Sequence, residues 1–140
     1  MPTPSTEQTQ MATFMGRAPA LDANGQIDNI AFKVNVITKG ASYTVKASES
    51  GSVFIASAVA TFTLPAPADG LYYIFINATD ANMTIAANAD DKMITFNDVD
   101  ADSIAFSTTS EKAGAMALVV SDGTMWYANK IGGNTMTVDT

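Results

Sequence analysis

Short runs in which hydrophobic and polar side chains alternate begin near residue 32 and continue almost to the end of the chain. This period of two is typical of β-strands, where alternate side chains point to opposite faces. In the first run, Phe32, Val34 and Val36 alternate with polar residues, so we expect these three to face a core. Runs rich in Thr, Ile, Val and aromatic residues predict further strands at 52–56, 82–86, 92–96, 103–107, 124–129 and 135–138.

Two more alternating runs each present one apolar face. In the run 43–46, Tyr43 and Val45 alternate with polar residues, and in the run 61–64, Phe62 and Leu64 do the same. Because one face of such a strand is buried and the other is solvated, we expect these four side chains to point inward. Many short strands of this kind, separated by turn residues, predict an all-β sandwich or barrel.

The runs 71–76 and 115–120 are apolar on both faces rather than on one. Such runs are typical of central strands that are covered on both sides. If a single sheet layer covers one side, the cover on the other side must come from the N-terminal segment or from another subunit. The sequence therefore predicts a contact surface on the outside of these two strands.

Two turn motifs separate the strands. Pro65 and Pro67 cannot continue a hydrogen-bonded ladder because proline has no N–H, and Gly70 can adopt the positive φ that a corner requires. Asp122 and Gly123 lie between two apolar runs, where an Asp-Gly pair favours a tight hairpin turn. We predict an antiparallel β-sandwich or jelly-roll-like domain over residues 32–140, with little helix.

Residues 1–31 form a different kind of segment, with prolines at 2, 4 and 19 and no sustained period of 2 or 3.6. We interpret them as an extended N-terminal arm. The arm is too apolar for a free solvated tail. It either docks on a neighbouring surface or packs back on its own domain, and both alternatives stay open. Its candidate contact residues are Met11, Phe14, Met15, Leu21 and Ile27.

Composition and charge narrow the function classes. The chain has 140 residues, of which 47% are hydrophobic and 15% are charged, so part of the apolar excess is expected at subunit contacts. The net charge of −7 opposes binding to nucleic acid and to anionic membranes. The longest apolar stretches are far shorter than the ~20 residues that span a bilayer. The polar start of the chain predicts no cleaved export signal.

The sequence offers few side chains suited to catalysis or metal binding, because it contains no histidine and no cysteine. The commonest general base, the cysteine nucleophile and the commonest metal ligand are therefore missing, and we expect neither enzymatic activity nor a cofactor. Asp98, Asp100 and Asp102 imitate the start of a calcium loop. However, Ser103 and Thr109 occupy the positions where an EF-hand loop has Gly and Glu, so an acidic turn is the preferred interpretation. A glycan hydrolase would need two carboxyls facing each other across a cleft, and no motif places them so.

Aromatic residues offer one alternative. Trp126 and Tyr127, together with Tyr72 and Tyr73, would suit a platform on which sugar rings stack. Alternating aromatic residues in strands more often form core or cross-strand pairs, so we interpret Asp122, Gly123, Trp126 and Tyr127 mainly as a packing hairpin.

The segments 43–54, 62–73 and 118–127, with their "TLPAP" corner and "SDGTMWY" hairpin, resemble small β-rich bacteriophage virion proteins. The similarity is to capsid decoration (cement) proteins in particular, and to related tail-fibre domains. The resemblance implies a homotrimeric structural protein, made in the host cytoplasm, that sits on the capsid surface and bridges subunits of the major capsid protein. The arm would then grip the capsid. The alternative that the resemblance implies is a receptor- or glycan-binding domain of a tail fibre.

Overall fold

The computed structural model describes residues 20–21, 27–28 and 33–140. The chain divides into two compact units, Met1–Lys33 and Val34–Thr140, and each is described by itself. In the first unit, β1 (Ala20–Leu21) pairs antiparallel with β2 (Ile27–Asp28), and Leu21 lies opposite Ile27 in this ladder. The other candidate arm residues, Met11, Phe14 and Met15, lie outside the described residues.

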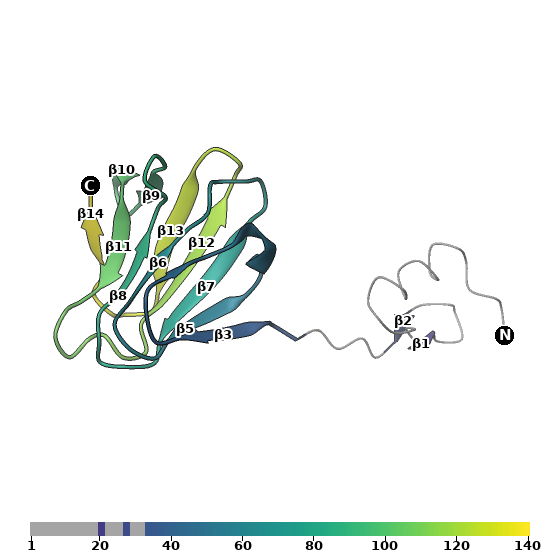
Figure 1. Cartoon of the computed structure of the whole chain (residues 1–140), viewed down its shortest axis with the longest axis horizontal. Coiled ribbons are helices and arrows are strands. Elements are labelled where there is room, and N and C mark those ends of the chain that lie inside the picture. The colour runs from purple at the N-terminus through teal and green to yellow at the C-terminus, as the bar shows by residue number, and fades with distance from the viewer. Residues whose placement is uncertain (1–19, 22–26, 29–32) are drawn as a thin grey trace. The chain divides into compact units, whose positions relative to one another are not determined.

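The second unit is an all-β sandwich of two mixed sheets, which Figure 1 shows as two layers. One sheet has seven strands and the other has five. In the described residues, the single helical element is the 3-10 turn η1 (Ala47–Glu49), and no helix is long and apolar enough to cross a membrane. The seven-stranded sheet runs in the spatial order β10 (Asp98–Ala101), β9 (Met93–Thr95), β13 (Trp126–Ile131), β12 (Met116–Ser121), β7 (Tyr72–Asn77), β5 (Val53–Ala56) and β3 (Val36–Lys39).

The five-stranded sheet covers the inner face of the seven-stranded one. Its strands run in the order β14 (Thr137–Asp139), β11 (Ser103–Phe106), β8 (Met83–Ala86), β6 (Ala60–Thr63) and β4 (Tyr43–Thr44).

The first half of the sandwich is wound as a coil rather than folded back in hairpins. From β3 to β8 the chain alternates between the sheets, so that β3, β5 and β7 lie side by side in one sheet and β4, β6 and β8 in the other. These neighbours are parallel, as are β13 and β9, so the prediction of a purely antiparallel sandwich is wrong for this half. Parallel neighbours need a crossover connection. Here each crossover is a strand of the opposite sheet. The alternation of side chains along a single strand does not show how that strand is connected to its neighbours, so the sequence pattern did not predict the parallel pairing.

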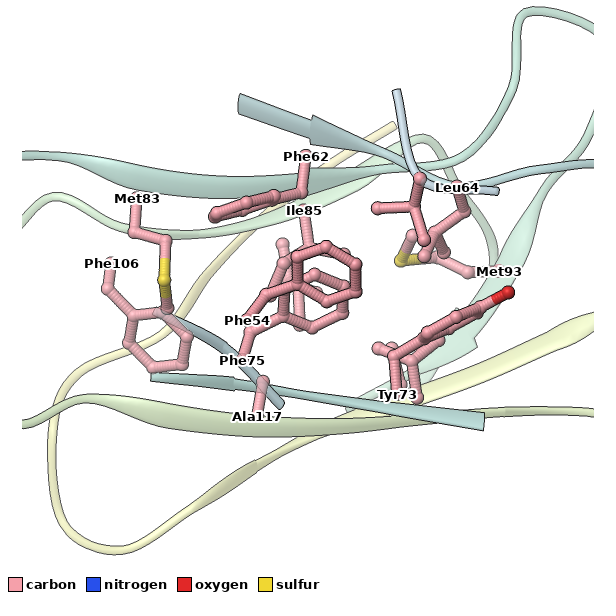
Figure 2. Close-up of a cluster of buried hydrophobic side chains, with 14 of the residues drawn as sticks. Phe54, Phe62, Leu64, Tyr73, Phe75, Met83, Ile85, Met93, Phe106 and Ala117 are labelled. Carbon is pink, nitrogen blue, oxygen red and sulfur yellow. The ribbon is translucent and has the colours of Figure 1, made fainter. Parts of the chain in front are cut away.

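The core is an aromatic cluster between the two sheets. Phe54 and Phe75 are register partners on β5 and β7, and their rings stack with centroids 5.5 Å apart. Phe62 approaches them from β6 in the other sheet, with its ring centroid 5.6 Å from Phe54 and 5.1 Å from Phe75. Figure 2 shows this trio at the centre of the cluster, with Phe106 toward one end and Tyr73 toward the other. These contacts fix which strands of the two sheets face each other.

The predicted inward faces are mostly confirmed. Phe62, Leu64 and Val45 are buried, and Tyr43 packs against the core. Val34 and Val36 are the exception, because both are exposed and the prediction that they face the core is wrong; Phe32 lies outside the described residues.

The physical reason is the register of β3. Ile37, the residue after Val36 on β3, lies opposite Phe54 of β5 and packs against the core. Because adjacent side chains on a strand point to opposite faces, Val36 must point to the outer side of the sheet. The side-chain amide of Asn35 also donates a hydrogen bond to the hydroxyl of Ser52, at 3.1 Å.

The acidic segment after β9 differs from its predicted form. Asp98–Ala101 is not a solvated turn but the strand β10, which pairs antiparallel with β9. The turn itself is made by Phe96 and Asn97, both of which have positive φ. Ala101 lies opposite Met93, and both are fully buried, so this pair holds the hairpin to the core although Asp100 is exposed and Asp98 is half-buried.

Candidate functional site

The outer face of the seven-stranded sheet is the most unusual surface of the sandwich, because its strands present apolar side chains to the outside as well as to the core. On β7, the inward Tyr73 and Phe75 alternate with the outward Ile74 and Ile76. On β12 the outward residues include Leu118. We call this surface the apolar face, and it consists of Val36, Val53, Ile55, Tyr72, Ile74, Ile76, Ile94, Met116, Leu118, Val120, Tyr127 and Ile131.

The strand registers place these side chains in rows across the sheet. The central row runs from Val36 through Val53, Ile74 and Leu118, and it ends at Asn129 on β13. Leu118 keeps 38% of its surface exposed in this row, at the middle of the sheet. Directly opposite apolar side chains reinforce one another across a sheet, but here their outer surfaces stay in contact with water.

The two flanking rows have the same character. One row joins Ile55, Ile76, Met116 and Ile131 across β5, β7, β12 and β13. The apolar face therefore extends over at least four adjacent strands, which Figure 1 shows side by side. The row on the other side joins Tyr72, Val120, Tyr127 and Ile94 across β7, β12, β13 and β9.

A groove of about 470 Å³ lies at the end of the apolar face near β9 and β10. The hairpin of β9 and β10 supplies one wall with Phe96 and Val99, and the outer side of β12 and β13 supplies the other. Leu118, Val120 and Tyr127 belong both to the groove and to the apolar face. The two features are therefore one continuous apolar surface.

Charged groups lie at the margins of this surface. Asp98 and Lys130 line opposite walls of the groove. A hydrogen bond from the Thr140 hydroxyl, followed by one from the Asp100 backbone N–H, holds the pKa of Asp98 below its usual value. Lys130 Nζ donates to the backbone oxygen of Asn134, at 2.9 Å. No residue of the apolar face itself is charged, so its surface offers a partner mainly hydrophobic contact.

The outer face of the five-stranded sheet is chemically different. Its outward side chains include Thr61 and Thr63 on β6, Thr84 on β8, Ser103 on β11 and Thr137 on β14. Hydroxyl groups of this kind are readily solvated, as expected for the water-facing side of an antiparallel or mixed sheet. The two outer faces of the sandwich therefore differ in polarity, and the apolar one belongs to the seven-stranded sheet.

The predicted hairpin forms at the turn between β12 and β13. Asp122 Oδ1 accepts hydrogen bonds from the backbone N–H groups of Thr124 and Met125, both at 2.9 Å, and Oδ2 accepts one from the Tyr127 hydroxyl, also at 2.9 Å. The Met125 bond is the largest cause of a lowered pKa at Asp122. The hydrogen bond from the Tyr127 hydroxyl to Asp122 raises the pKa of Tyr127. Gly123 has a φ of 98°, which a residue with a Cβ rarely adopts.

This hairpin is joined to the "TLPAP" corner. Trp126 is fully buried, and its Nε1–H donates to the carbonyl oxygen of Pro65 at 3.1 Å. The Gly70 N–H donates to the Ser121 carbonyl oxygen, so the two motifs are bonded at two places. Trp126 therefore organises the core and is not available for stacking on a sugar.

Two of the four candidate platform aromatics remain at the surface. Tyr73 is buried like Trp126, whereas Tyr72 and Tyr127 are both nearly half exposed. They lie in the same row of the apolar face, with Val120 between them. The platform predicted from the sequence is thus reduced to two tyrosines, and they belong to the larger apolar surface.

The candidate calcium ligands do not converge. Asp98 is engaged by Thr140 and by the Asp100 backbone, while Asp102 forms an ion pair with Lys92. The hydrogen bond from Lys92 to Asp102 raises the pKa of the lysine. Within the described part of the chain, no group of three or more acidic side chains is placed to hold a metal ion.

Sequence reasoning missed Phe96 and Val99, which border the groove. The sequence predicts Phe96 as the last residue of a strand at 92–96, whereas β9 ends at Thr95 and Phe96 lies in the turn. The one local indication of the turn was Asn97, a residue type that tolerates positive φ. The runs 71–76 and 115–120 were predicted to be apolar on both faces, and their outer sides form the middle of the apolar face.

The chain matches no protein-family model and no curated protein sequence. Function is therefore inferred from the apolar face and from the residue motifs.

Proposed function

We propose that this chain is a non-catalytic structural protein of a bacteriophage virion. It self-associates through the apolar face into a homotrimer, binds the outside of the capsid and stabilises the shell by bridging subunits of the major capsid protein. The observation that carries this proposal is the continuous apolar face on the outside of the seven-stranded sheet. The sequence resemblance to capsid decoration proteins supplies the biological setting.

The apolar face favours an interface on energetic grounds. Soluble monomers rarely expose contiguous apolar patches larger than a few hundred Å². Burial stabilises an interface by roughly 25 cal/mol for each Å² of apolar surface removed from water. Leu118, Val120, Tyr127 and Ile131 keep between 38% and 44% of their surface exposed, so a partner that covers them gains contacts that the isolated chain does not make.

The remaining surface suits a protein that must stay soluble before it assembles. The net charge of −7 disfavours non-specific aggregation, while the apolar face carries no charge that would oppose docking. The absence of histidine and cysteine from the sequence removes the side chains that most enzymes use for acid–base and nucleophilic chemistry. Both features fit a structural role better than a catalytic one.

The N-terminal arm completes the proposal. Residues 1–31 would bind the capsid through Met11, Phe14, Met15, Leu21 and Ile27. We also propose that the sandwich is related to jelly-roll folds. Three arms on one trimer bind together more tightly than one arm alone, because the second and third contacts form at high effective concentration. Weak individual contacts would then be enough to hold the protein on the shell.

The first test separates self-association from capsid binding. Light scattering should give the mass of a trimer for the full chain, and Leu118→Asn should lower it toward the monomer because it places an amide in the central row of the apolar face. Thr84→Asn, in the middle of the opposite face, is the matched control and should leave the mass unchanged. A wild-type chain that stays monomeric over the same concentrations would contradict the proposal.

The second test addresses the capsid. Purified protein should add to capsids that lack it, and Phe14→Asp in the full chain should abolish this addition while the trimer persists. Loss of the trimer in Phe14→Asp would contradict the assignment of the arm to capsid binding. Failure of the wild-type trimer to add to such capsids would contradict the decoration role itself.

A second candidate function is a receptor- or glycan-binding domain of a phage tail fibre. The observation that favours it is the pair of exposed tyrosines, Tyr72 and Tyr127, with Asp122 hydrogen-bonded to the second. Aromatic faces beside carboxylate groups are suited to sugar rings and their hydroxyls. Saturable glycan binding that is lost in Tyr127→Ala would support this role over the first, whereas the buried Trp126 weighs against it.

A further inference from the structure

The sequence contains two Asp-Gly pairs, and both lie in turns of the sandwich. Asp69–Gly70 belongs to the corner before β7, and Asp122–Gly123 lies in the turn between β12 and β13. Asp-Gly pairs isomerise readily, because glycine has no side chain to hinder attack by its amide nitrogen on the neighbouring carboxyl group. The two pairs are therefore candidate sites of the same spontaneous modification.

The two pairs are held in the same way on the glycine side. The Gly70 N–H donates to the carbonyl oxygen of Ser121, and the Gly123 N–H donates to the hydroxyl of the same serine, both at 3.1 Å. Both glycines also have positive φ, 83° and 98° respectively. The glycine nitrogen, which is the nucleophile of the reaction, is thus restrained to a similar degree at both places.

The two aspartates differ on the carboxyl side. The Asp122 carboxylate accepts hydrogen bonds from two backbone N–H groups of its turn and from the Tyr127 hydroxyl. The Met125 N–H does most to lower the pKa of Asp122, so the neutral acid, from which water leaves most easily, is scarce there. Asp69 is exposed, and no other described residue forms a hydrogen bond or an ion pair with its side chain.

We propose that Asp69 is a site of spontaneous isomerisation to isoaspartate in the folded protein, and that the hydrogen bonds to Asp122 protect the second Asp-Gly pair from the same reaction. The modification needs no enzyme and no cofactor. It concerns the chemical lifetime of the chain and does not depend on the proposed self-association.

The reaction balances without any reagent other than water. The Gly70 nitrogen attacks Cγ of Asp69, and the carboxyl hydroxyl leaves as water with the amide proton, which closes a succinimide ring. Water then adds to one of the two ring carbonyl groups. Cleavage of the bond to the main-chain carbonyl carbon leaves the chain running through Cβ and Cγ, which is isoaspartate, and cleavage of the other bond returns aspartate.

The corner lies in direct contact with the hairpin turn, so a change in its main chain has a structural effect. A Cβ atom at Gly123 would lie 3.4 Å from the Asp69 backbone nitrogen and 3.5 Å from its Cβ. The Leu71 N–H closes the corner by donating to the Ala68 carbonyl oxygen, at 3.2 Å. Isoaspartate places an extra methylene group in this turn, and we expect it to weaken both the turn and the bond from Gly70 to the hairpin.

Ageing of the full chain at neutral pH, below its melting temperature, tests the proposal. Mass spectrometry with electron-transfer dissociation distinguishes isoaspartate from aspartate, which have the same mass. Isoaspartate should accumulate at Asp69 at least about tenfold faster than at Asp122, because hydrogen bonds to the Asp122 carboxylate must be lost before it reacts. The Asn24–Gly25 pair lies outside the described residues, and deamidation there is recorded separately because it changes the mass.

The same chain unfolded in concentrated urea is the matched control. Both turns are lost there, so the two Asp-Gly pairs should react at similar rates and the preference for Asp69 should disappear. An equal preference in urea and in the folded protein would mean that the neighbouring residues in the sequence, rather than the hydrogen bonds, set the two rates. That result would overturn the inference, as would a folded protein in which Asp69 reacts no faster than Asp122.

Two variants test the two parts of the proposal separately. Tyr127→Phe removes one hydrogen bond from Asp122 and should raise isomerisation there severalfold, while Asp69 keeps its wild-type rate. Asp69→Glu keeps the charge but would have to close a larger ring, so the corner should no longer react. The melting temperature of Asp69→Glu should then stay constant on ageing while that of the wild type falls. An unchanged rate at Asp122 in Tyr127→Phe would overturn the protective role of its hydrogen bonds.

Discussion

Asp122 organises the turn between β12 and β13 through a single carboxylate. Its oxygens accept hydrogen bonds from the backbone of Met125 and Thr124 and from the Tyr127 hydroxyl. All three bonds favour the ionised carboxylate, and the Met125 bond contributes most to lowering the pKa of Asp122. The turn that begins the outer strand β13 is therefore coupled to the charge on one residue.

This coupling predicts an acid-sensitive contribution to stability. Because the folded-state pKa lies below the ordinary value of 3.8, the contribution is complete above that pH and is lost as the pH falls through the lowered pKa. Asp122→Asn keeps an acceptor oxygen but removes the charge, so it should melt below the wild type at neutral pH. The difference in melting temperature should shrink as the pH falls through the lowered pKa of Asp122.

Thermal melts of the two proteins across this pH range check the prediction. Asp98 and Glu111 also have lowered pKa values, each mainly through a side-chain hydrogen bond, so the wild type and the variant should both lose stability in acid. The Asp122 contribution is the difference between their two curves. Parallel curves at every pH would show that the charge on Asp122 does not stabilise the fold.

At the scale of the strands, the sequence predicts where a strand occurs and which of its side chains point inward better than it predicts which strands are neighbours. The alternation in 61–64 correctly buries Phe62 and Leu64, because one strand's pattern is enough to define its inner face. The same pattern is compatible with a parallel or an antiparallel neighbour. The parallel coil is defined instead by distant contacts, such as the stacking of Phe54 on Phe75.

The sequence pattern did not predict the correct structure of two strands in which polar and apolar residues do not alternate regularly. Asp98–Ala101 was interpreted as a turn because its aspartates dominate the composition, whereas the buried Ala101 and its pairing with Met93 decide its structure. In Val36–Lys39 the adjacent Val36 and Ile37 leave two possible inner faces, and the contact of Ile37 with the core selects one. Tertiary packing, which a local pattern does not contain, resolved both cases.

The arrangement of strands predicts an order of local stability. Amides of β7 and β12 should exchange with solvent most slowly, since both strands are bonded on two sides near the middle of the sheet. Amides of the edge strands β3 and β4 should exchange at least about tenfold faster. In β5, the Val53 N–H donates to the Asn35 carbonyl oxygen, so it should show intermediate protection.

Hydrogen exchange followed residue by residue measures this order. Protection of the Val53 amide tests the parallel coil in particular, because its hydrogen bond to Asn35 joins β5 to the start of its parallel neighbour β3. Exchange of Val53 at the rate of a free loop amide would contradict the parallel pairing of β3 and β5. Equal protection of β3 and β7 would contradict the edge position of β3.

For the whole molecule, the location of the candidate site followed from the sequence only in part. The runs 71–76 and 115–120 indicated strands covered on both sides, and the sandwich shows that their outer sides merge into the apolar face. The width of that face depends on β5 and β13 lying on either side of them, which is a property of the topology. The groove depends further on the β9–β10 hairpin, which the sequence did not predict because Asp98–Ala101 was interpreted as a turn.

The proposed self-association joins copies that each carry a net charge of −7 through a face without charged side chains, so it should respond to salt in a defined way. Salt screens the repulsion between like-charged copies, and sulfate in addition strengthens apolar contacts because it is excluded from protein surfaces. Raising sodium sulfate from about 0.02 M to about 0.5 M should therefore shift the wild type toward the oligomer. Sedimentation or light scattering at a fixed, partly dissociating concentration measures this shift.

Sodium chloride at equal ionic strength separates the two effects, because it screens charge without strengthening apolar contacts to the same degree. Association should rise in both salts and rise more in sulfate, and Leu118→Asn should lose the extra response to sulfate while it keeps the response to screening. Dissociation of the wild type on addition of either salt would mean that ion pairs such as one between Asp98 and Lys130 of neighbouring copies, rather than the apolar face, hold the assembly together.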